Sequence, residues 1–227
     1  MNLYIVRHGN PNYSTDHLTE LGHKQAEACA NAMLDLKIDE IHASPQGRAQ
    51  ETAGHLAEKL GLPIITEPWA HEVEHWVDNG HGGMTLAVQA DPTYLRSPEV
   101  EGNPDWAKLP VFNGEEGILG MINEIESGAQ EMLRGQGYIL EGNRFKIADV
   151  ANPNEKNIAL FCHAGMFLVL TSFLLRMPQL TAWHSFFMYQ TGITWCNLNN
   201  YDSGYTVPRY LYINKTDHLM KDGLPLT

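Results

Sequence analysis

Two runs of consecutive apolar residues stand out in the pattern of hydrophobic and polar positions along this chain. The first, Leu3–Val6, leads into Arg7-His8-Gly9, and the second, Ile158–Cys162, leads into His163-Ala164-Gly165. Short apolar runs of this kind are typical of strands buried on both faces, as in a parallel sheet. Because ligands bind beyond the carboxyl ends of such strands, we expect both histidines in a crevice rather than in the core.

The rest of the pattern predicts helices and further strands in alternation. Apolar residues recur at helical spacing after Thr19, after Arg48 and from Ile118 to Met132, and residues 166–175 predict an almost wholly apolar helix. Four further segments have the length and apolar content of strands: 39–44, 63–65, 192–198 and 209–213. Residues 10–16 predict a loop over the first strand end, and residues 135–153 predict a polar, irregular stretch. An α/β fold follows from this order.

The 227 residues are enough for one large domain with an inserted cap. We predict a single domain over residues 1–227 with a lid insertion at about 76–153. Residues 79–113 within it are rich in glycine, proline and isolated aromatic residues and have no long period. Trp76, Tyr94 and Trp106 either line a pocket there or form the core of the lid, and a core role is the more common one.

Composition excludes several kinds of partner. The formal net charge of -12 argues against nucleic acid and anionic membrane surfaces, because both bind a basic face. No stretch reaches the ~20 apolar residues of a membrane span and no signal-peptide pattern opens the chain, so we expect a cytoplasmic protein. Cys29, Cys162 and Cys196 lie far apart, which predicts three buried thiols rather than a disulfide or a zinc site. The sequence leaves the oligomeric state open.

The residues at the strand ends indicate a phosphate site. An arginine beside a histidine, as in Arg7-His8, suits the binding of a phosphoryl group against an imidazole nucleophile. Arg48 is expected at the start of the second helix, where free backbone N–H groups and the helix dipole favour an anion. The ordinary alternative is that these are solvated side chains at a strand end and in a first helical turn.

Five short segments in order resemble one family. Arg7-His8-Gly9 is followed by L-T-x-x-G-x-x-Q-A at residues 18–26 and by S-P-x-x-R-A-x-E-T-A at residues 44–53, and His163-Ala164-Gly165 and N-x-x-x-H-L at residues 214–219 come later. In these features the chain resembles the histidine phosphatase superfamily, also called phosphoglycerate mutase-like. The resemblance covers roughly the first sixty residues densely, the last seventy loosely and the middle not at all. It implies a three-layer α/β/α fold with a mainly parallel sheet and an inserted lid segment.

The resemblance also implies a phosphohistidine intermediate and a role for each site residue. Neutral His8 attacks phosphorus, Arg7 and Arg48 hold the phosphoryl oxygens, and His163 donates a further hydrogen bond. The family places a general acid shortly after the third strand, where Glu72 fits best and Glu74 is the alternative.

Three further residues, Asn10, Tyr13 and Ala164, are expected to contact the substrate. No metal and no cofactor is implied, and the expected partner is a phosphorylated small molecule. Within the family, mutases carry a longer polar signature after the R-H-G triplet. The segment 10–13 departs from that signature, so simple hydrolysis is favoured over phosphoglycerate mutase-type transfer.

Two other functions remain as alternatives. His71-Glu72-x-x-His75 matches the H-E-x-x-H zinc signature, and His81 lies six residues further on, where a third ligand is expected. Pro68 leaves room for at most one helical turn before His71, which argues against a zinc helix. A phosphate-binding module without turnover would use the same pocket. It is disfavoured because the four phosphate-contacting residues and an acid are all present.

Overall fold

The computed structural model describes residues 1–78, 83–112 and 115–227. Its centre is a six-stranded sheet in the order β13-β11-β1-β10-β4-β5. The strands are Arg209–Lys215 (β13), Ile193–Asn197 (β11), Asn2–Arg7 (β1), Asn157–Cys162 (β10), Glu40–Ala43 (β4) and Ile64–Thr66 (β5). Only β11 runs antiparallel to its neighbours, so the sheet is mainly parallel as predicted.

The two apolar runs of the sequence are adjacent central strands. β1 pairs with β10 in parallel over their whole length, with Arg7 opposite Cys162 at the carboxyl ends. This confirms the prediction that the two strand ends lie side by side. His8 and His163 each follow immediately, so the sheet itself brings together two residues that are 155 positions apart in the chain.

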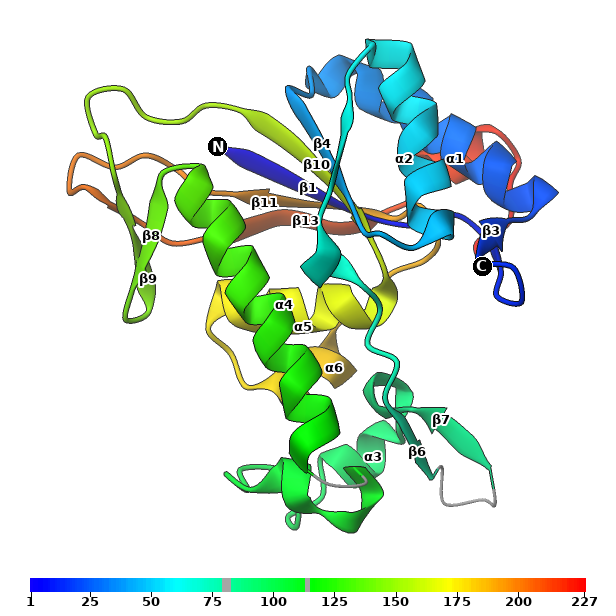
Figure 1. Ribbon diagram of the computed structural model, residues 1–227, viewed down its shortest axis with the longest axis vertical. Helices are drawn as coiled ribbons and strands as arrows, with labels where there is room; N and C mark the ends of the chain where they lie inside the picture. Colours follow the sequence, from blue (N-terminus) through cyan, green and yellow to red (C-terminus); the bar gives the residue numbers. More distant parts are fainter. Residues whose placement is uncertain (79–82, 113–114) are drawn as a thin grey trace.

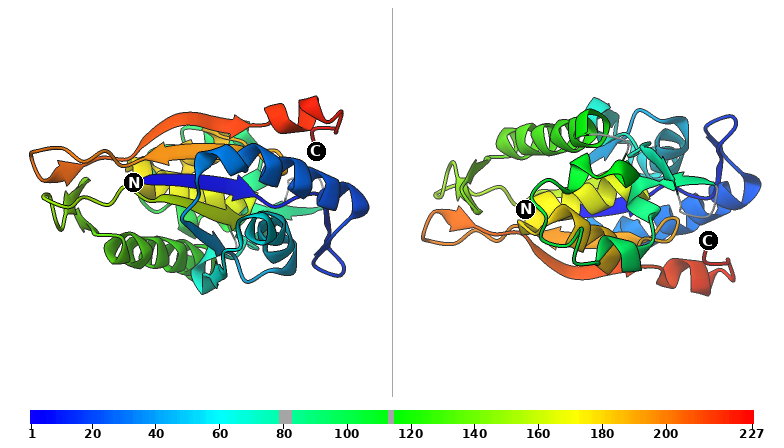
Figure 2. Two further views of the ribbon diagram at one scale, coloured as in Figure 1. Left: turned by 90° about the horizontal axis from the view of Figure 1, so that it is seen from above. Right: turned by 90° about the horizontal axis from the view of Figure 1, so that it is seen from below.

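Helices cover both faces of the sheet, which gives the expected three layers (Figures 1 and 2). Tyr4 and Val6 face a core formed with Glu20–Met33 (α1) and Gly47–Leu60 (α2). Leu3 and Ile5 face the opposite core, formed with Glu115–Gly135 (α4), Ala164–Leu175 (α5) and Gln179–Ser185 (α6). The alternation follows from the period of two in a strand, which sends successive side chains to opposite faces.

The start of α1 is held against the end of β1. The Thr19 side chain caps the helix by accepting a hydrogen bond from Gly22 N, as its place in the sequence predicts. A Cβ atom on Gly9 would lie 2.6 Å from the carbonyl oxygen of Gly22. This close approach requires glycine, and it fixes the backbone that leads out of the sheet beside His8.

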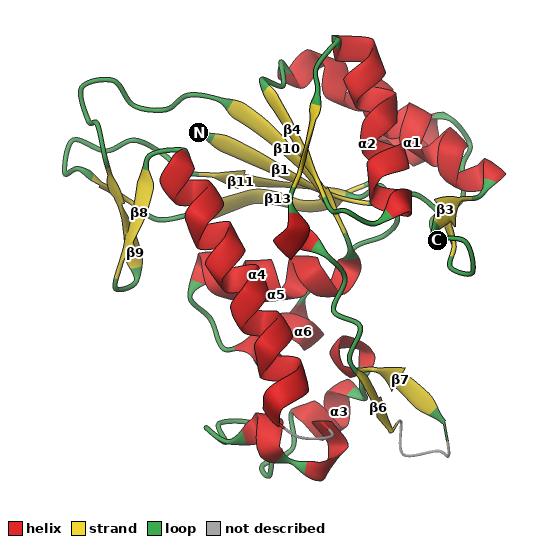
Figure 3. Ribbon diagram, viewed as in Figure 1, coloured by secondary structure: helices red, strands yellow, loops and turns green. Residues whose placement is uncertain are grey.

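The segment between β5 and β10 forms two separate groups of elements (Figure 3). Close to one end of α4 lie Trp76–Asp78 (β6), Met84–Leu86 (β7) and Pro92–Leu95 (α3), with 3₁₀ turns at Ala87–Gln89, Trp106–Lys108 and Pro110–Phe112. A further 3₁₀ turn at Pro68–Ala70 lies nearer the sheet, where Trp69 packs against Gly128 of α4. At the other end of α4, Arg144–Ile147 (β9) pairs with both Tyr138–Glu141 (β8) and Tyr205–Thr206 (β12). The expected lid over 76–153 stays a prediction, and its residues 79–82 and 113–114 lie outside the described part of the chain.

Three local expectations were wrong or incomplete. Residues 135–153 are not irregular, because β8 and β9 form a hairpin that buries Tyr138, Phe145 and Ile147. Each of its strands has only four residues, too few for a clear alternating pattern. The helix α6 was not anticipated. The loop over the first strand end contains a short ladder between Pro11–Asn12 (β2) and His17–Leu18 (β3).

Other expectations are settled by burial. All three cysteines are free and buried, as predicted. Trp106 is partly buried: it packs edge-on against the core residues Phe112 and Trp183 and also lines a cavity, whereas Trp76 is exposed on β6. The chain also contains a 3₁₀ turn at Leu34–Leu36 and a final helix at Asp217–Lys221 (α7). None of the helices in the described ranges combines the length and the apolar content needed to cross a membrane.

Candidate active site

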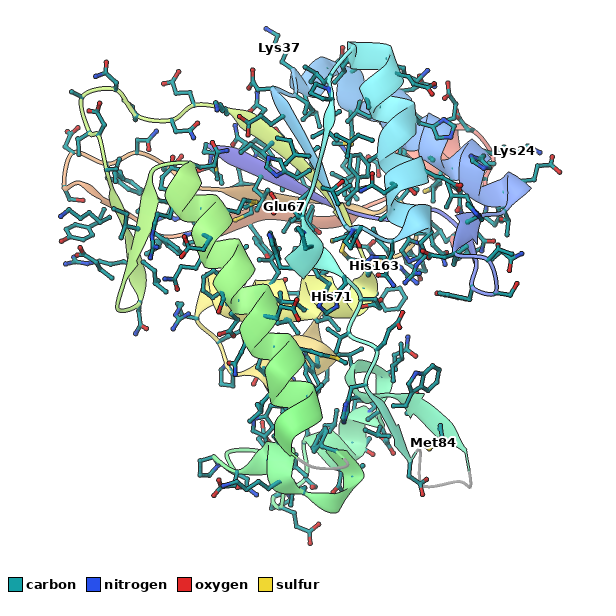
Figure 4. The ribbon with its side chains drawn as sticks, viewed as in Figure 1. Lys24, Lys37, Glu67, His71, Met84 and His163 are labelled. Atoms are coloured by element: carbon teal, nitrogen blue, oxygen red, sulfur yellow. The ribbon has the colours of Figure 1, made fainter. Side chains whose placement is uncertain are left out.

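Two buried imidazoles face each other where β1 and β10 end. The ring centroids of His8 and His163 are 5.1 Å apart, and the two residues are 1% and 0% exposed. Figure 4 shows His163 where the sheet meets α5, with His71 beside it. This separation lets both side chains contact one phosphoryl group, so the geometry agrees with the predicted pairing of the two strand-end histidines.

The surroundings of His8 keep it neutral and fix its tautomer. Its Nδ1 lies 2.7 Å from the carbonyl oxygen of Gly9, so Nδ1 carries the proton and donates it to that oxygen. Burial, and after it the charge of Arg7, lowers the pKa of His8 to about 3. At neutral pH the ring therefore presents Nε2 with a free lone pair, as a nucleophile needs.

The contacts of His163 allow it the same Nδ1–H tautomer as His8. Its Nε2 lies 2.7 Å from the Ser44 hydroxyl, and its buried Nδ1 has no partner among the described residues. Burial, together with the neighbouring His8 and the two arginines, holds the pKa of His163 well below its ordinary value. If Ser44 donates to Nε2, the Nδ1–H of the neutral ring is free to donate to a ligand.

Both arginines are fixed by protein oxygen atoms. Arg7 Nη1 donates to the Met188 carbonyl at 2.6 Å. Arg48, the second residue of α2, is 4% exposed and pairs with Asp16, whose other carboxylate oxygen accepts the backbone N–H of Gly47. The Nε atoms of both arginines are buried and without a partner in the described ranges. Two guanidinium groups and the start of a helix thus converge near the histidines, an arrangement suited to an anion.

The two acid candidates have different surroundings. The Oε1 atom of Glu72 accepts hydrogen bonds from the backbone N–H groups of Val73 at 2.9 Å and Met166 at 3.0 Å, in the first turn of α5. Burial raises the pKa of Glu72, with these hydrogen bonds acting in the opposite direction. Glu74 is exposed at the rim, where it accepts from Gln46 and lies 3.9 Å from Arg48. A raised pKa inside the site is what a proton donor requires, which favours Glu72.

Comparison with known proteins agrees with this geometry. The family model described as histidine phosphatase superfamily (branch 1) matches residues 3–96, which hold β1, α1, β4, α2 and β5. Over these residues the chain matches the histidine phosphatase superfamily. The elements that supply His8, Arg48 and Glu72 to the site all fall within the matched residues.

Proteins that resemble this chain are named both as phosphatases and as phosphoglycerate mutases. The chain is 23% identical to a putative phosphoserine phosphatase 2 of Hydrogenobacter thermophilus, over 95% of this chain and 96% of that one. It is 30% identical to a probable phosphoglycerate mutase GpmB of Yersinia enterocolitica over 57% of each chain, so the chain spans little more than half of that relative. A solved mycobacterial glucosyl-3-phosphoglycerate phosphatase has the same fold, with a TM-score of 0.63 at 20% identity over 95% of this chain and 99% of that chain.

The geometry of residues 71–75 contradicts the zinc alternative. Residues 71–75 are extended rather than helical, so His71 and His75 do not lie one helical turn apart on a shared face. His71 Nε2 lies 3.2 Å from Glu124, and His75 Nε2 lies 2.6 Å from the Phe112 carbonyl oxygen. His81 lies outside the described residues. The 3₁₀ turn that begins at Pro68 ends before His71, as the position of the proline predicts.

Several residues that support the candidate site are not identified by the sequence analysis. Ser44 contacts His163, Asp16 orients Arg48, Met188 holds Arg7, and Thr52 accepts the backbone N–H of Gly9 at 3.0 Å. Ser44 and Thr52 lie inside the S-P-x-x-R-A-x-E-T-A segment, so the motif held a signal for them. Met188 acts through its carbonyl group, which leaves no trace in a sequence.

The three expected substrate contacts lie around this site. Asn10 accepts the Thr19 hydroxyl at its Oδ1 atom, Tyr13 is 69% exposed with its ring 5.5 Å from the Arg48 guanidinium, and Ala164 opens α5 next to His163. Their contact with substrate stays a prediction.

Proposed function

We propose that this chain hydrolyses a small phosphomonoester through a phosphohistidine formed on His8. The observation that carries the proposal is a neutral, buried imidazole whose Nε2 is free, with two arginines and a second imidazole around it. Phosphoryl transfer needs little more than positioning and preplaced positive charge. The match of residues 3–96 to the histidine phosphatase superfamily, and the similarity to a protein named as a phosphatase, support the same reaction class.

The first half of the reaction transfers the phosphoryl group to the enzyme. His8 Nε2 attacks phosphorus while the bond from phosphorus to the alcohol oxygen breaks. Arg7 and Arg48 neutralise the charge on the equatorial oxygens, and His163 Nδ1–H donates to one of them. Glu72 gives its proton to the departing alcohol oxygen, which would otherwise leave as an unstable alkoxide.

The second half returns the enzyme to its starting state. Water attacks the phosphorus of the phosphohistidine, and the Glu72 carboxylate takes up the proton that the water loses. The bond between phosphorus and Nε2 breaks, inorganic phosphate leaves, and His8 is again neutral. Glu72 thus acts as acid and then as base, and its raised pKa suits the first of these roles.

Hydrolysis is proposed rather than mutase-type transfer because of the segment after Gly9. In this chain Pro11–Asn12 pairs with His17–Leu18 in a short ladder, and the longer polar signature of mutases is absent from residues 10–13. A mutase must also keep the phosphoenzyme from water until a second acceptor oxygen is in place.

The decisive experiment is His8→Ala assayed on p-nitrophenyl phosphate. We expect turnover to fall by at least about 10³-fold with circular dichroism unchanged, because the nucleophile is lost while the fold does not depend on its ring. His23→Ala, which removes an exposed histidine from α1, should retain activity. Rapid quenching of the wild type should trap an acid-labile phosphoprotein that is absent from His8→Ala. Near wild-type turnover in His8→Ala would exclude the mechanism.

A further inference from the structure

A cavity of about 370 Å³ opens directly beside the phosphoryl site. Arg7 and Ala164 contribute to its wall, so it is continuous with the place where phosphate would bind. Its volume falls within the range of about 300–1,000 Å³ that small-molecule sites occupy. The part of the substrate that leaves with the alcohol oxygen has to lie next to the phosphoryl group, and this cavity is in a position to receive it.

The wall of this cavity is mainly apolar. Six of its residues come from α3 and the segment before it, from α5 and from the region around α6: Val88, Leu95, Leu168, Trp183, Phe186 and Met188. Arg7 is the only lysine or arginine in the described lining, which contains no aspartate or glutamate. A substrate carboxylate or ammonium group placed here would lose its water without gaining an opposite charge of its own, which is costly.

His184 is a polar residue in the wall of this cavity. Both nitrogen atoms of its ring are buried and have no hydrogen-bond partner among the described residues, and the Nε1 atom of Trp183 is in the same condition. His184 lines this cavity and also an adjoining one of about 460 Å³ that contains Arg96. Buried polar atoms are normally paired, so an unpaired imidazole in a cavity wall indicates a group that a ligand satisfies.

We propose that this cavity binds an uncharged, mainly apolar alcohol portion of the substrate, and that His184 forms a hydrogen bond with a polar atom on it. The substrate class is then a phosphomonoester of a ring-bearing or branched alcohol without a carboxylate. A phosphorylated hydroxy acid or amino acid fits less well, because its second charge finds no partner in the cavity. The inference rests on the phosphatase function proposed above and narrows its substrate.

A matched pair of esters tests the charge preference. Phenyl phosphate and 3-carboxyphenyl phosphate have nearly equal leaving groups and differ by one carboxylate. We expect kcat/KM to be at least about tenfold higher for phenyl phosphate, and higher again for 2-naphthyl phosphate, which fills more of the cavity.

Adding a cation to the wall should reduce this preference. Gln89 is exposed and lines the cavity, so Gln89→Lys places a positive charge there at low risk to folding. We expect Gln89→Lys to lower the ratio of kcat/KM for phenyl phosphate to kcat/KM for 3-carboxyphenyl phosphate several-fold. Leu211→Lys is the matched control, because it adds the same charge at an exposed position on edge strand β13, and it should leave the ratio unchanged.

His184 is tested with a panel of hydroxylated naphthyl phosphates. In the wild type, the best hydroxylated ester should exceed 2-naphthyl phosphate in kcat/KM, and His184→Phe should abolish that advantage while it still hydrolyses the parent ester. An advantage that persists in His184→Phe would overturn the hydrogen bond to His184.

The outcomes separate this inference from the function on which it depends. If no ester is hydrolysed, including p-nitrophenyl phosphate, the phosphatase function itself fails. If esters are hydrolysed but 3-carboxyphenyl phosphate equals or exceeds phenyl phosphate, the phosphatase function stands and the uncharged substrate class is wrong. If Arg96→Ala in that case hydrolyses phenyl phosphate better than 3-carboxyphenyl phosphate, the substrate carboxylate binds in the adjoining cavity that contains Arg96.

Discussion

At the scale of single residues, the chemistry depends on keeping two histidines neutral in a positively charged site. Burial and the adjacent arginines lower the pKa of His8 and of His163. A protonated His8 would have no lone pair at Nε2, so in the proposed mechanism the two arginines that bind phosphate also keep the nucleophile neutral. Glu72 differs from both, because burial raises its pKa and favours the protonated acid.

The role of Glu72 predicts a dependence on the leaving group. Glu72→Gln should lower kcat for an alkyl phosphate by about 10²–10⁴-fold, because an alkoxide needs a proton as it departs. The loss for p-nitrophenyl phosphate should be much smaller, since nitrophenolate leaves without one. Glu74→Gln is the control and should affect both substrates little. Equal losses for the two esters in Glu72→Gln would move the acid role to another group.

The arrangement of charge also predicts catalysis without a metal ion. Arg7, Arg48, His163 and the start of α2 already supply the positive field that a dication would provide to a phosphoryl group. Activity should therefore survive prolonged treatment with a chelator, and vanadate, which adopts the five-coordinate geometry of the transferring phosphorus, should inhibit. Loss of activity to the chelator with recovery on adding zinc would contradict this.

At the scale of elements, the site is assembled where the first turn of α5 meets the extended segment 71–75. The backbone N–H of Met166 holds Glu72, and Gly165 allows that contact because it has no side chain. A Cβ atom at Gly165 would lie 2.6 Å from Glu72 Oε1 and 3.1 Å from Val88. The packing of α5 against the segment therefore sets the position of the acid.

This contact predicts opposite results for two helical glycines. Gly165→Ala should displace Glu72 and lower kcat on alkyl phosphates by about tenfold or more, since small misplacements of a catalytic group are costly. Gly120→Ala on α4 meets nothing within 4 Å. It should keep full activity and raise the free energy of unfolding by about 0.5–1 kcal/mol, because alanine restricts the unfolded chain. Steady-state kinetics gives kcat on alkyl phosphates, and urea unfolding gives the free energy of unfolding. Full activity in Gly165→Ala would contradict the proposed contact.

At the scale of the whole molecule, a buried ion cluster stabilises one edge of the sheet. His42 on β4 is almost fully buried between Glu67, at 2.7 Å, and Glu40, at 3.2 Å. Burial by itself would lower the pKa of His42, but the hydrogen bonds and charges of the two glutamates prevail and raise it above 6.5. The folded state therefore binds a proton here more tightly than the unfolded state does.

The sign of the resulting pH effect follows from linkage. The stabilisation from His42 is fully present below about pH 6.5 and is lost as the pH rises through the raised pKa of the folded state. The difference in the free energy of unfolding between the wild type and His42→Gln, measured in urea from pH 5 to 9, should therefore shrink as the pH rises. A difference that does not change over this range would show that the pair of glutamates does not hold a proton on His42.

The sequence by itself determined the two central strands, the caps of the first helices and the residues at the strand ends. These features have local causes. Apolar runs, a capping threonine and a glycine after a helix each act within a few residues, so Thr19 and Gly61 lie where the pattern predicts them. The motifs then named His8, Arg48 and His163, because the chemistry of phosphate restricts the residue types that serve it.

Only the tertiary structure decided how these parts combine. The choice between Glu72 and Glu74 depends on which one reaches α5, more than ninety residues further along the chain. His71 and His75 contact Glu124 and the Phe112 carbonyl, and the sequence pattern does not reveal these partners because they lie far along the chain. The hairpin at 138–147 is stabilised by a third strand from residues 205–206. The cavity at His184 likewise exists only because the segment before α3, α5 and α6 pack together, since its wall is built from long-range contacts between residues that carry no motif.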